Sequence, residues 1–341
     1  MPAETSEVVV AKRGGPRALR LTSRPLPTAG DGEVRIDVRA SGVAFGDLLL
    51  REGLVKAAPK PFVPGYDVAG VVGAVGAGVE GLAVGDRVVA ATGGWGGYAA
   101  HVVLPAWKAV RYSVDVTPEA ATSLALNYLT AYQMLRRTTN LAPGSTVLIH
   151  SAAGGVGSAL VQLGALRGLR MFGTASAGKA AQVEAMGATA IDYRSDDFVA
   201  RVRREASGGV DAVFDGLGPH SWKRSYPLLR ANGILVPYGI TSAFPGGRRS
   251  LPRLAGAFLR APRTGYFDYF AKGVGVVGYS SGPMISEHPD WYREDLTALL
   301  DLLGAGRIEP LIHRVYPLGR VAEAHEELGR GRAAGKIVLT R

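Results

Sequence analysis

A glycine-rich turn contains the residues of this 341-residue chain that point most directly to chemistry. Residues 152–157 read Ala-Ala-Gly-Gly-Val-Gly, follow the apolar run 146–149 and precede an amphipathic stretch over 158–166. A turn without side chains lets phosphate oxygens approach the backbone, and the helix behind it offers free N–H groups and the positive end of its dipole. The sequence therefore predicts a dinucleotide site here, with Ala152 in place of the first glycine of the G-x-G-x-x-G template.

The residues after the next expected strand distinguish between the two nicotinamide dinucleotides. An NAD site has Asp or Glu about 20 residues past the glycine turn, where it accepts hydrogen bonds from the ribose. Here Ser176 and Lys179 stand in that place, and no acidic residue precedes Glu184. A hydroxyl and an ammonium suit a 2′-phosphate, so we expect NADP(H), with Tyr193 as a further contact. A solvated Lys179 and a packed Tyr193 are the alternatives.

Strands and helices alternate from residue 145 to residue 240, which predicts an α/β fold with a doubly wound parallel sheet of the Rossmann type. We expect strands over 145–150, 169–174, 189–193, 210–215 and 233–239, and helices over 156–168, 178–186, 196–206 and 220–230. The carboxyl ends of such strands line the cofactor site. The candidate cofactor contacts at these ends are Ala153, Gly154, Gly155, Val156, Gly157, Thr174, Gly216, Tyr238 and Gly239.

The first 120 residues or so follow a different pattern. Short β segments separated by Gly and Pro predict a compact, barrel-like antiparallel domain. Thr117-Pro118-Glu119 begins a helical stretch to residue 137 that we expect to be broken near Asn127. Near the C-terminus we expect a strand over 274–279, helices over 290–303 and 319–329, and a final strand over 336–339.

The composition excludes several classes of function. The chain has no cysteine, which excludes disulfides, thiolate metal sites and a cysteine nucleophile, and its six histidines show no paired metal-ligand spacing, so we expect no metal. The net charge is +10, but the basic residues are dispersed and no nucleic-acid-binding motif is present. Without a signal peptide or an apolar run of about 20 residues, a cytoplasmic location is expected.

These motifs together resemble the medium-chain dehydrogenase/reductase superfamily. The resemblance is to its zinc-independent quinone oxidoreductase branch, and within it to the vesicle amine transport protein type. It implies a GroES-like β-barrel substrate domain over 1–122 and 268–341, an NADP-binding Rossmann domain over 123–267, and a homodimer. The residues that carry the resemblance are 64–70, 127–132, 152–157, 173–177, 191–193 and 335–339.

The resemblance also implies an activity, namely NADPH-dependent hydride transfer to a quinone or an α,β-unsaturated carbonyl. It adds Thr130 and Lys336 to the candidate cofactor contacts. Zinc-dependent relatives have Gly-His-Glu where this chain has Gly65-Tyr66-Asp67, so zinc chemistry is not expected. Quinone reductase relatives have Asn and Tyr at the positions of Ala44 and Val55, which indicates an altered, more apolar substrate site.

Hydride transfer to an enone leaves an enolate, which needs a hydrogen-bond donor and then a proton. The candidate catalytic residues for this task are Tyr66, Asn127 and Tyr128, although Tyr66 could instead be a packing residue at the domain interface. Asp47 could hold the substrate-side loop or cap a helix. The candidate substrate-binding residues are Ala44, Asp47, Val55 and Tyr279.

The segment 245–272 leaves the function open. Leu251, Leu254, Ala255, Phe258 and Leu259 fall on one helical face that Pro262 would end, which predicts a lid over the cleft between the domains. The same face could instead be an interfacial helix of an NADPH-binding protein that works at a membrane or with a partner and turns over little. A third possibility is an enoyl or ketone reductase of specialised metabolism.

Overall fold

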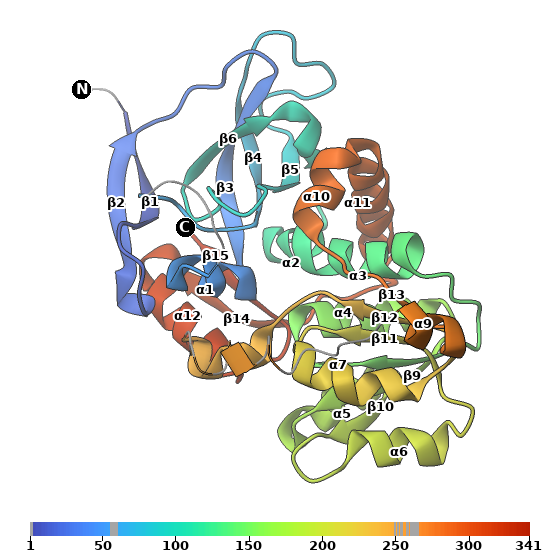
Figure 1. The fold of residues 1–341 in the computed structure, drawn as a ribbon. Helices are drawn as coiled ribbons and strands as arrows, with labels where there is room; N and C mark the ends of the chain where they lie inside the picture. Colours follow the sequence, from blue (N-terminus) through green and yellow to red (C-terminus); the bar gives the residue numbers. More distant parts are fainter. Residues whose placement is uncertain are drawn as a thin grey trace. The chain divides into compact units, whose positions relative to one another are not determined.

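The computed structural model describes residues 3–54, 61–248, 250, 252, 255, 256, 259 and 266–341. The chain divides into two compact units. The first unit comprises Met1–Leu129, Gly246–Arg248 and Ser281–Arg341, and the second comprises Thr130–Pro245 and Arg249–Ser280 (Figure 1). Val55 and most of the expected lid helix lie outside the described residues.

Six parallel strands form the sheet of the second unit. Their order is β10-β9-β8-β11-β12-β13, so that counting from β8 the order is 3-2-1-4-5-6. This order reverses between β8 and β11, which is the topological switch point where dinucleotides bind in such sheets. The predicted doubly wound parallel fold is confirmed. The strands are β8 (Thr146–Ile149), β9 (Arg170–Ala175), β10 (Thr189–Asp192), β11 (Val210–Asp215), β12 (Leu229–Pro237) and β13 (Gly275–Val276).

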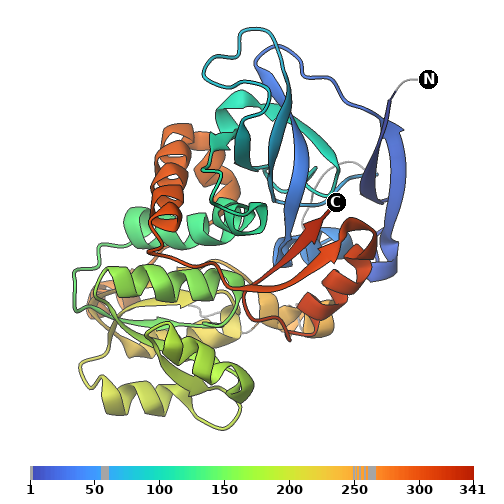
Figure 2. The same ribbon diagram turned by 180° about the vertical axis from the view of Figure 1, so that it is seen from behind.

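Helices cover both faces of this sheet (Figure 2). Phe172 and Gly173 are neighbours on β9 and so point to opposite faces. Phe172 belongs to an apolar cluster with Phe198 and Val202 of α6, whereas Gly173 lies against Val183 of α5. The helices are α4 (Gly155–Leu166), α5 (Ala177–Ala185), α6 (Phe198–Glu205), α7 (Pro219–Ser225) and α9 (Tyr266–Lys272).

Three expected elements of the second unit have different bounds in the structure. The helix predicted over 220–230 ends at Ser225, and β12 begins at Leu229 rather than at residue 233. The reason is Pro227, which has no N–H to continue the helix and sits in a short 3-10 turn. The strand predicted over 274–279 is shorter, with β13 at Gly275–Val276, although Val277 N and Tyr279 N still donate to Leu235 O and Pro237 O of β12.

The first unit is built around a seven-stranded sheet with the order β14-β15-β3-β4-β5-β7, in which β6 also pairs with β3. All these pairs are antiparallel except β14 with β15, as predicted for the N-terminal part. Strand β15 near the C-terminus lies beside β3 (Figure 1). The strands are β3 (Glu33–Val43), β4 (Asp67–Val75), β5 (Arg87–Ala91), β6 (His101–Pro105), β7 (Val110–Arg111), β14 (Ile312–Pro317) and β15 (Lys336–Thr340), with a separate ribbon of β1 (Glu4–Val10) and β2 (Leu19–Pro25).

Helices complete the first unit. Thr117 caps α2 as expected, because its hydroxyl oxygen accepts a hydrogen bond from Ala120 N at 3.2 Å. Beyond α2 the helix widens into a π-helical turn over Leu124–Tyr128 and continues directly into α3, so the helical stretch is not broken near Asn127, contrary to the prediction. No described helix is long and apolar enough to span a bilayer. The helices are α1 (Phe45–Glu52), α2 (Pro118–Ser123), α10 (Ser281–Glu287), α11 (Pro289–Gly304) and α12 (Val321–Gly329), and α3 (Leu129–Gln133) leads into the second unit.

Candidate cofactor and substrate sites

The glycine turn lies between β8 and α4 in the second unit. Gly154 N donates to Ser151 O at 2.8 Å, and Ser151 itself has a φ of 56°. A Cβ at Gly157 would lie 2.2 Å from Ser151 O, so only glycine fits. The first bond of α4 runs from Ser158 N to Gly154 O, which leaves the N–H groups of residues 155–157 without an acceptor inside the helix. This cradle fits a pyrophosphate.

Buried polar side chains hold the turn from behind. Thr174 Oγ1 accepts from Ser151 N at 3.2 Å and lies 3.1 Å from His150 Nδ1. His150 Nε2 lies 2.9 Å from Ser225 Oγ. Burial lowers the pKa of His150, so the ring is neutral near pH 7. The hydroxyl of Thr174 therefore supports the turn, and its contact with a cofactor stays a prediction.

The candidate 2′-phosphate residues follow two paired strand ends. Tyr193 N donates to Ala175 O at 3.2 Å, which brings the residue after β10 beside Ser176, where β9 ends. Lys179 is half-buried, and burial followed by the charge of Arg194 lowers its pKa. Lys179 and Arg194 repel each other, and a doubly charged anion such as a phosphate between them would relieve this repulsion. Arg194, whose guanidinium lies 5.7 Å from the Tyr193 ring centroid, was not expected from the sequence.

The ends of β11 and β12 also meet. A Cβ at Gly216 would lie 2.9 Å from the Tyr238 ring, and one at Gly239 would lie 2.7 Å from Gly216 O. Burial, followed by the charge of Asp215, raises the pKa of Tyr238. Asp215 Oδ1 accepts from Leu217 N at 2.7 Å, whereas its buried Oδ2 has no hydrogen-bond partner among the described residues. Asp215 is fully buried, and its Oδ2 lies 3.7 Å from the buried His150 Nε2.

Two further candidates of the second unit are buried. Tyr279 donates its hydroxyl to Gln133 Oε1 at 2.7 Å, so this group has a partner within the unit. Thr130 is 6 % exposed. Their predicted roles, at substrate for Tyr279 and at cofactor for Thr130, stay predictions.

On the first unit, Asp47 and Tyr66 lie around the first turn of α1. Asp47 Oδ2 accepts from Ala44 N at 2.8 Å, and Oδ1 accepts from Gly65 N at 2.8 Å. The Tyr66 ring covers Gly46, where a Cβ would lie 2.7 Å from Tyr66 Oη. Burial, followed by the charge of Asp47, raises the pKa of Tyr66 above its ordinary value of 10.0. Tyr66 is therefore a neutral hydrogen-bond donor near pH 7, not a source of tyrosinate.

A second buried cluster of the first unit includes Lys336. Its Nζ lies 2.6 Å from Asp67 Oδ2 and donates to Asn127 Oδ1 at 3.4 Å. Asp67 Oδ1 accepts from Gly42 N at 2.7 Å and from the Thr122 hydroxyl at 3.1 Å. The ammonium of Lys336 thus neutralises a buried carboxylate, and its predicted contact with a cofactor remains untested. Its bond to Asn127 Oδ1 orients that amide.

Tyr128 and Trp95 add two aromatic groups to this unit. The Tyr128 hydroxyl is buried and has no hydrogen-bond partner among the described residues, and burial raises its pKa. Trp95 is 48 % exposed and was not expected from the sequence. Its loop is tied to the Tyr66 segment, because Gly96 N donates to Val63 O at 2.7 Å and the Thr92 hydroxyl donates to Gly65 O at 2.6 Å. A lone tryptophan among glycines has no periodic pattern that would have revealed it.

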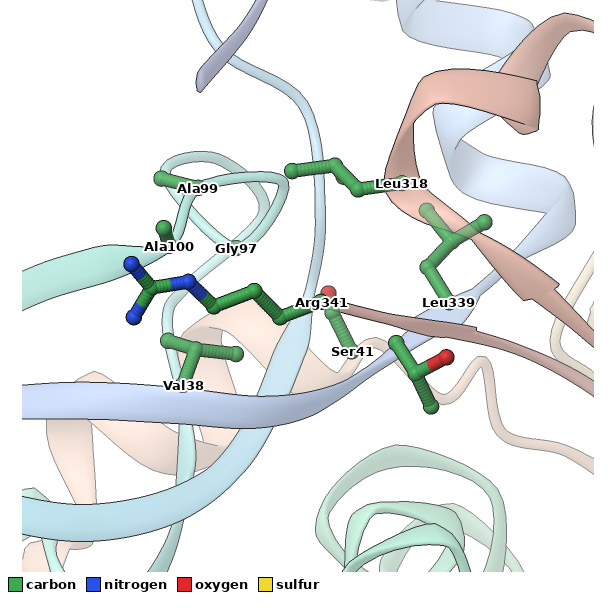
Figure 3. Close-up of a pocket in the computed structure, with 9 residues that line it drawn as sticks. Val38, Ser41, Gly97, Ala99, Ala100, Leu318, Leu339 and Arg341 are labelled. Atoms are coloured by element: carbon green, nitrogen blue, oxygen red, sulfur yellow. The ribbon is translucent and has the colours of Figure 1, made fainter. Parts of the chain in front are cut away.

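A small pocket of the first unit is not a candidate site. Its volume of about 10 Å³ leaves room for about one water molecule. Ser41, Leu339 and the last residue, Arg341, are among the residues that line it, and the Arg341 side chain extends across it (Figure 3). No substrate of the expected size fits there.

Potential metal ligands do not cluster among the described residues. Among the described residues, no three His, Asp or Glu side chains lie together in a way that could hold a metal ion. The chain has no cysteine, and Tyr66 stands between Gly65 and Asp67. The residues present therefore do not fit a zinc site.

Comparison with known proteins places this geometry in a family. A model of the alcohol dehydrogenase GroES-like domain matches residues 30–114, and a model of the zinc-binding dehydrogenase family matches residues 186–339. The synaptic vesicle membrane protein VAT-1 homolog of Rattus norvegicus is 35 % identical over 337 residues, which are 97 % of this chain and 83 % of the relative. The chain belongs to the quinone oxidoreductase and VAT-1 branch of the medium-chain dehydrogenase/reductase superfamily.

Further members of this branch are similar over nearly their whole length. Quinone oxidoreductase 1 of Escherichia coli K12 is 34 % identical, over 96 % of this chain and 97 % of the relative. The crystal structure of the human VAT-1 homolog-like protein superposes with a TM-score of 0.87 at 29 % identity, covering 99 % of this chain and 98 % of that one. Escherichia coli quinone oxidoreductase, crystallised with NADPH, superposes with a TM-score of 0.86 at 28 % identity, covering 98 % and 100 %. The first unit of this medium-chain reductase is thus GroES-like, and its second unit is Rossmann-like.

Proposed function

We propose that this protein is an NADPH-dependent, zinc-independent oxidoreductase that transfers hydride to a quinone or an α,β-unsaturated carbonyl compound. The observation that carries the proposal is the set of Ser176, Lys179, Tyr193 and Arg194 beside the paired ends of β9 and β10. This set offers hydroxyls and cations, with no acidic residue at the position that would accept from a 2′-hydroxyl. Relatives crystallised with NADPH support it.

The second unit would hold the cofactor, which supplies the hydride when bound. The N–H groups of residues 155–157 would donate to the pyrophosphate, and Gly157 lets the backbone come close to it. Lys179 and Arg194 would neutralise the 2′-phosphate, with a hydrogen bond from Ser176.

The first unit would bind the acceptor. Tyr66, whose raised pKa keeps it protonated, would donate a hydrogen bond to the oxygen on which negative charge develops. The amide of Asn127, oriented by Lys336, and the buried hydroxyl of Tyr128 are further donors. Because these tyrosines hold their protons tightly, the proton that completes the reduction would come from water.

An acceptor screen tests the activity. Consumption of NADPH and NADH is followed with 1,4-benzoquinone, a naphthoquinone and 2-cyclohexenone. We expect turnover with NADPH at least tenfold faster than with NADH at equal concentration, a preference of about 1.4 kcal/mol. Preference for NADH would overturn the assignment of the 2′-phosphate site.

Gly46→Ala tests the role of Tyr66 with little cost to the helix. The new Cβ would meet the Tyr66 ring and displace it, whereas alanine favours the helical backbone. We expect a fall of about tenfold in kcat/KM for the acceptor. Gly282→Ala in α10 meets nothing within 4 Å and is the matched control. Unchanged kinetics for Gly46→Ala would remove Tyr66 from the site.

A second candidate function is favoured by the names of the relatives. Several of them, at up to 35 % identity, are called synaptic vesicle membrane protein VAT-1 homologs. This protein would then bind NADPH but act chiefly through a membrane or a partner. Tight NADPH binding without turnover on any acceptor, together with co-sedimentation with anionic vesicles, would favour this candidate over the reductase.

The remaining details of the proposal are an enoyl or ketone substrate of specialised metabolism as an alternative acceptor, a homodimeric state and a cytoplasmic location. The proposed domain boundaries are 1–122 with 268–341, and 123–267. Light scattering of the purified protein tests the homodimer. A single species at monomer mass across the micromolar range would contradict it.

A further inference from the structure

A line of buried side chains runs behind the first turn of α1 in the first unit. Tyr98 donates its hydroxyl to Asp47 Oδ2 at 2.9 Å, and Tyr98 Oη lies 3.0 Å from His325 Nε2. His325 Nδ1 lies 3.1 Å from Arg51 Nη1. None of the four side chains is more than 1 % exposed. They come from α1, from the segment just before β6, and from α12.

Only one arrangement of protons completes this line. Arg51 has no acceptor, so His325 Nδ1 must accept from it, and the proton of the neutral imidazole is then on Nε2. This Nε2–H donates to Tyr98 Oη, and the tyrosine proton is left for Asp47. Asp47 must therefore accept at this end, as it also accepts from Ala44 N and Gly65 N. A carboxylate accepts from all three donors, whereas the O–H of a carboxylic acid would find no acceptor among these three groups.

The orientation of Arg51, at one end of the line, is fixed by its other hydrogen bonds. Its Nε donates to Gly14 O at 2.9 Å, and its Nη2 donates to Gly247 O at 3.1 Å and to Glu52 Oε1 at 3.0 Å. The guanidinium is thereby locked in one orientation by three acceptors besides His325. The direction of the whole line follows from this end.

The other end of the line faces the proposed acceptor site. The Asp47 carboxylate joins the backbone of Ala44, where α1 begins, to that of Gly65, directly before Tyr66. The Tyr66 ring packs on Gly46, one residue before Asp47. We propose that the Asp47 carboxylate is a positioning group that fixes the place of Tyr66. Tyr98, His325 and Arg51 set the direction of the hydrogen bonds so that Asp47 remains an acceptor. This inference rests on the proposed reductase function.

The charges around Asp47 make the arrangement sensitive to pH near neutrality. Burial raises the pKa of Asp47 to about 7, with a further contribution from Asp67, against the three hydrogen bonds, which lower it. Burial lowers the pKa of His325, which keeps the ring neutral. The titratable or charged groups that act on Asp47 directly or along the line are Tyr66, Asp67, Tyr98, His325 and Arg51, while Lys336, Glu52 and Arg248 act on these in turn.

Three variants of the full-length protein separate positioning from simple packing. Tyr98→Phe removes the donor to Asp47, and His325→Leu removes both bonds of the imidazole. His325→Gln keeps an amide oxygen for Arg51 and an amide N–H for Tyr98. The kcat/KM for 1,4-benzoquinone is measured from pH 5.5 to 9 with saturating NADPH.

We expect the acid limb of the kcat/KM profile to move up by about one pH unit in Tyr98→Phe, because losing one hydrogen bond to a carboxylate raises its pKa by about that much. His325→Leu should move it in the same direction, because Tyr98 Oη, no longer accepting from His325, can then accept from a protonated Asp47. Near pH 7 this lowers kcat/KM several-fold, while the Kd for NADPH stays unchanged. His325→Gln should restore the wild-type profile. An unmoved acid limb in Tyr98→Phe and His325→Leu, with only a lower Tm, would overturn the inference.

A measurement without turnover distinguishes this inference from the proposed function. The amide ¹H–¹⁵N signals of Ala44 and Gly65 report the charge of Asp47, to which both groups donate. We expect both signals to titrate together, with a midpoint that rises in Tyr98→Phe. If the wild type reduces no acceptor but the midpoint shifts, the reductase assignment fails and the hydrogen-bond line stands. If the midpoint does not shift, the line fails whether or not the enzyme turns over.

Discussion

The glycine turn of the second unit and the buried polar cluster of the first unit are built in opposite ways. The turn consists of consecutive residues, and its function resides in backbone N–H groups that side chains would obstruct. The cluster takes Asp47, Asp67, Tyr98, His325 and Lys336 from positions spread over nearly 300 residues. A site of the first kind tolerates no added atom, whereas one of the second kind tolerates no unpaired charge. We therefore expect an added side-chain atom to disrupt the glycine turn, and the loss of one charged partner to disrupt the buried cluster.

The largest effect is expected when the Lys336–Asp67 pair is broken. Lys336→Met leaves the Asp67 carboxylate buried without its counter-charge, and we expect the free energy of unfolding to fall by about 3–5 kcal/mol. Urea denaturation at pH 7 measures it. Arg320→Ala, which breaks an exposed pair with Glu323, is the control and should leave the midpoint within error. Equal stability of the two variants would show that the buried pair is dispensable.

A single methyl group should disable the turn. In Gly157→Ala the new Cβ would meet the backbone oxygen of Ser151 at 2.2 Å, so the turn must move. We expect NADPH to bind about 100-fold more weakly, a loss of about 2.8 kcal/mol. Titration of NADPH fluorescence measures the Kd. Gly208→Ala in the same unit, where the Cβ meets nothing within 4 Å, should bind NADPH like the wild type.

The charge of Asp47 should appear in the pH dependence of stability. Burial raises its pKa from 3.8 to about 7, so between these values the native state holds a proton that the unfolded chain has released. Its contribution to stability therefore falls as pH rises through this window. Relative to wild type, Asp47→Asn should gain up to about 1.4 kcal/mol per pH unit between pH 4.5 and 7.

Urea denaturation of the two proteins at several pH values measures that difference. His325 acts in the opposite sense. Burial lowers its pKa below 6.5, so the imidazole binds a proton in the unfolded chain at pH values where the native ring stays neutral. This contribution is present in both proteins and cancels in the comparison. A difference that stays constant with pH would show that Asp47 is ionised throughout.

The smallest effect is expected from the cations near Tyr193. Lys179→Ala should weaken NADPH binding about tenfold, and Arg194→Ala by less because its guanidinium is more exposed, whereas NADH binding should not change. Calorimetric titration with both dinucleotides measures the two Kd values. Arg204→Ala, on an exposed part of α6, is the matched control. Equal losses for NADPH and NADH would place both cations away from the 2′-phosphate.

The fold of the second unit was largely predictable from the sequence. Apolar runs at regular spacing predicted β8 to β12 to within a few residues, except that β12 begins four residues early because Pro227 ends the preceding helix. For the first unit the sequence predicted antiparallel strands, the helices near residues 290–303 and 319–329 and the final strand, but not which strands pair. The parallel pairing of β14 with β15 depends on contacts between distant segments, which no local pattern records.

The candidate sites divide in the same manner. Residues 152–157 and the pair Ser176 and Lys179 could be proposed as cofactor contacts from the sequence, because cofactor chemistry dictates residue types at short spacing. Arg194 and Trp95 were not expected, because an exposed arginine or tryptophan in a loop has no distinctive neighbours in sequence. Nor did the sequence indicate that the ammonium of Lys336 is paired with Asp67, 269 residues away along the chain.

The sequence by itself determined the glycine turn, the cysteine-free composition and the missing acid after β9, since these are properties of residue type and local spacing. Only the tertiary structure decided which polar groups are buried together. The direction of the hydrogen bonds from Arg51 through His325 and Tyr98 to Asp47 exists because α1, α12 and the segment before β6 pack against one another. Because these four side chains are buried away from water, each must find its hydrogen-bond partners within the protein, and this fixes the order of the bonds.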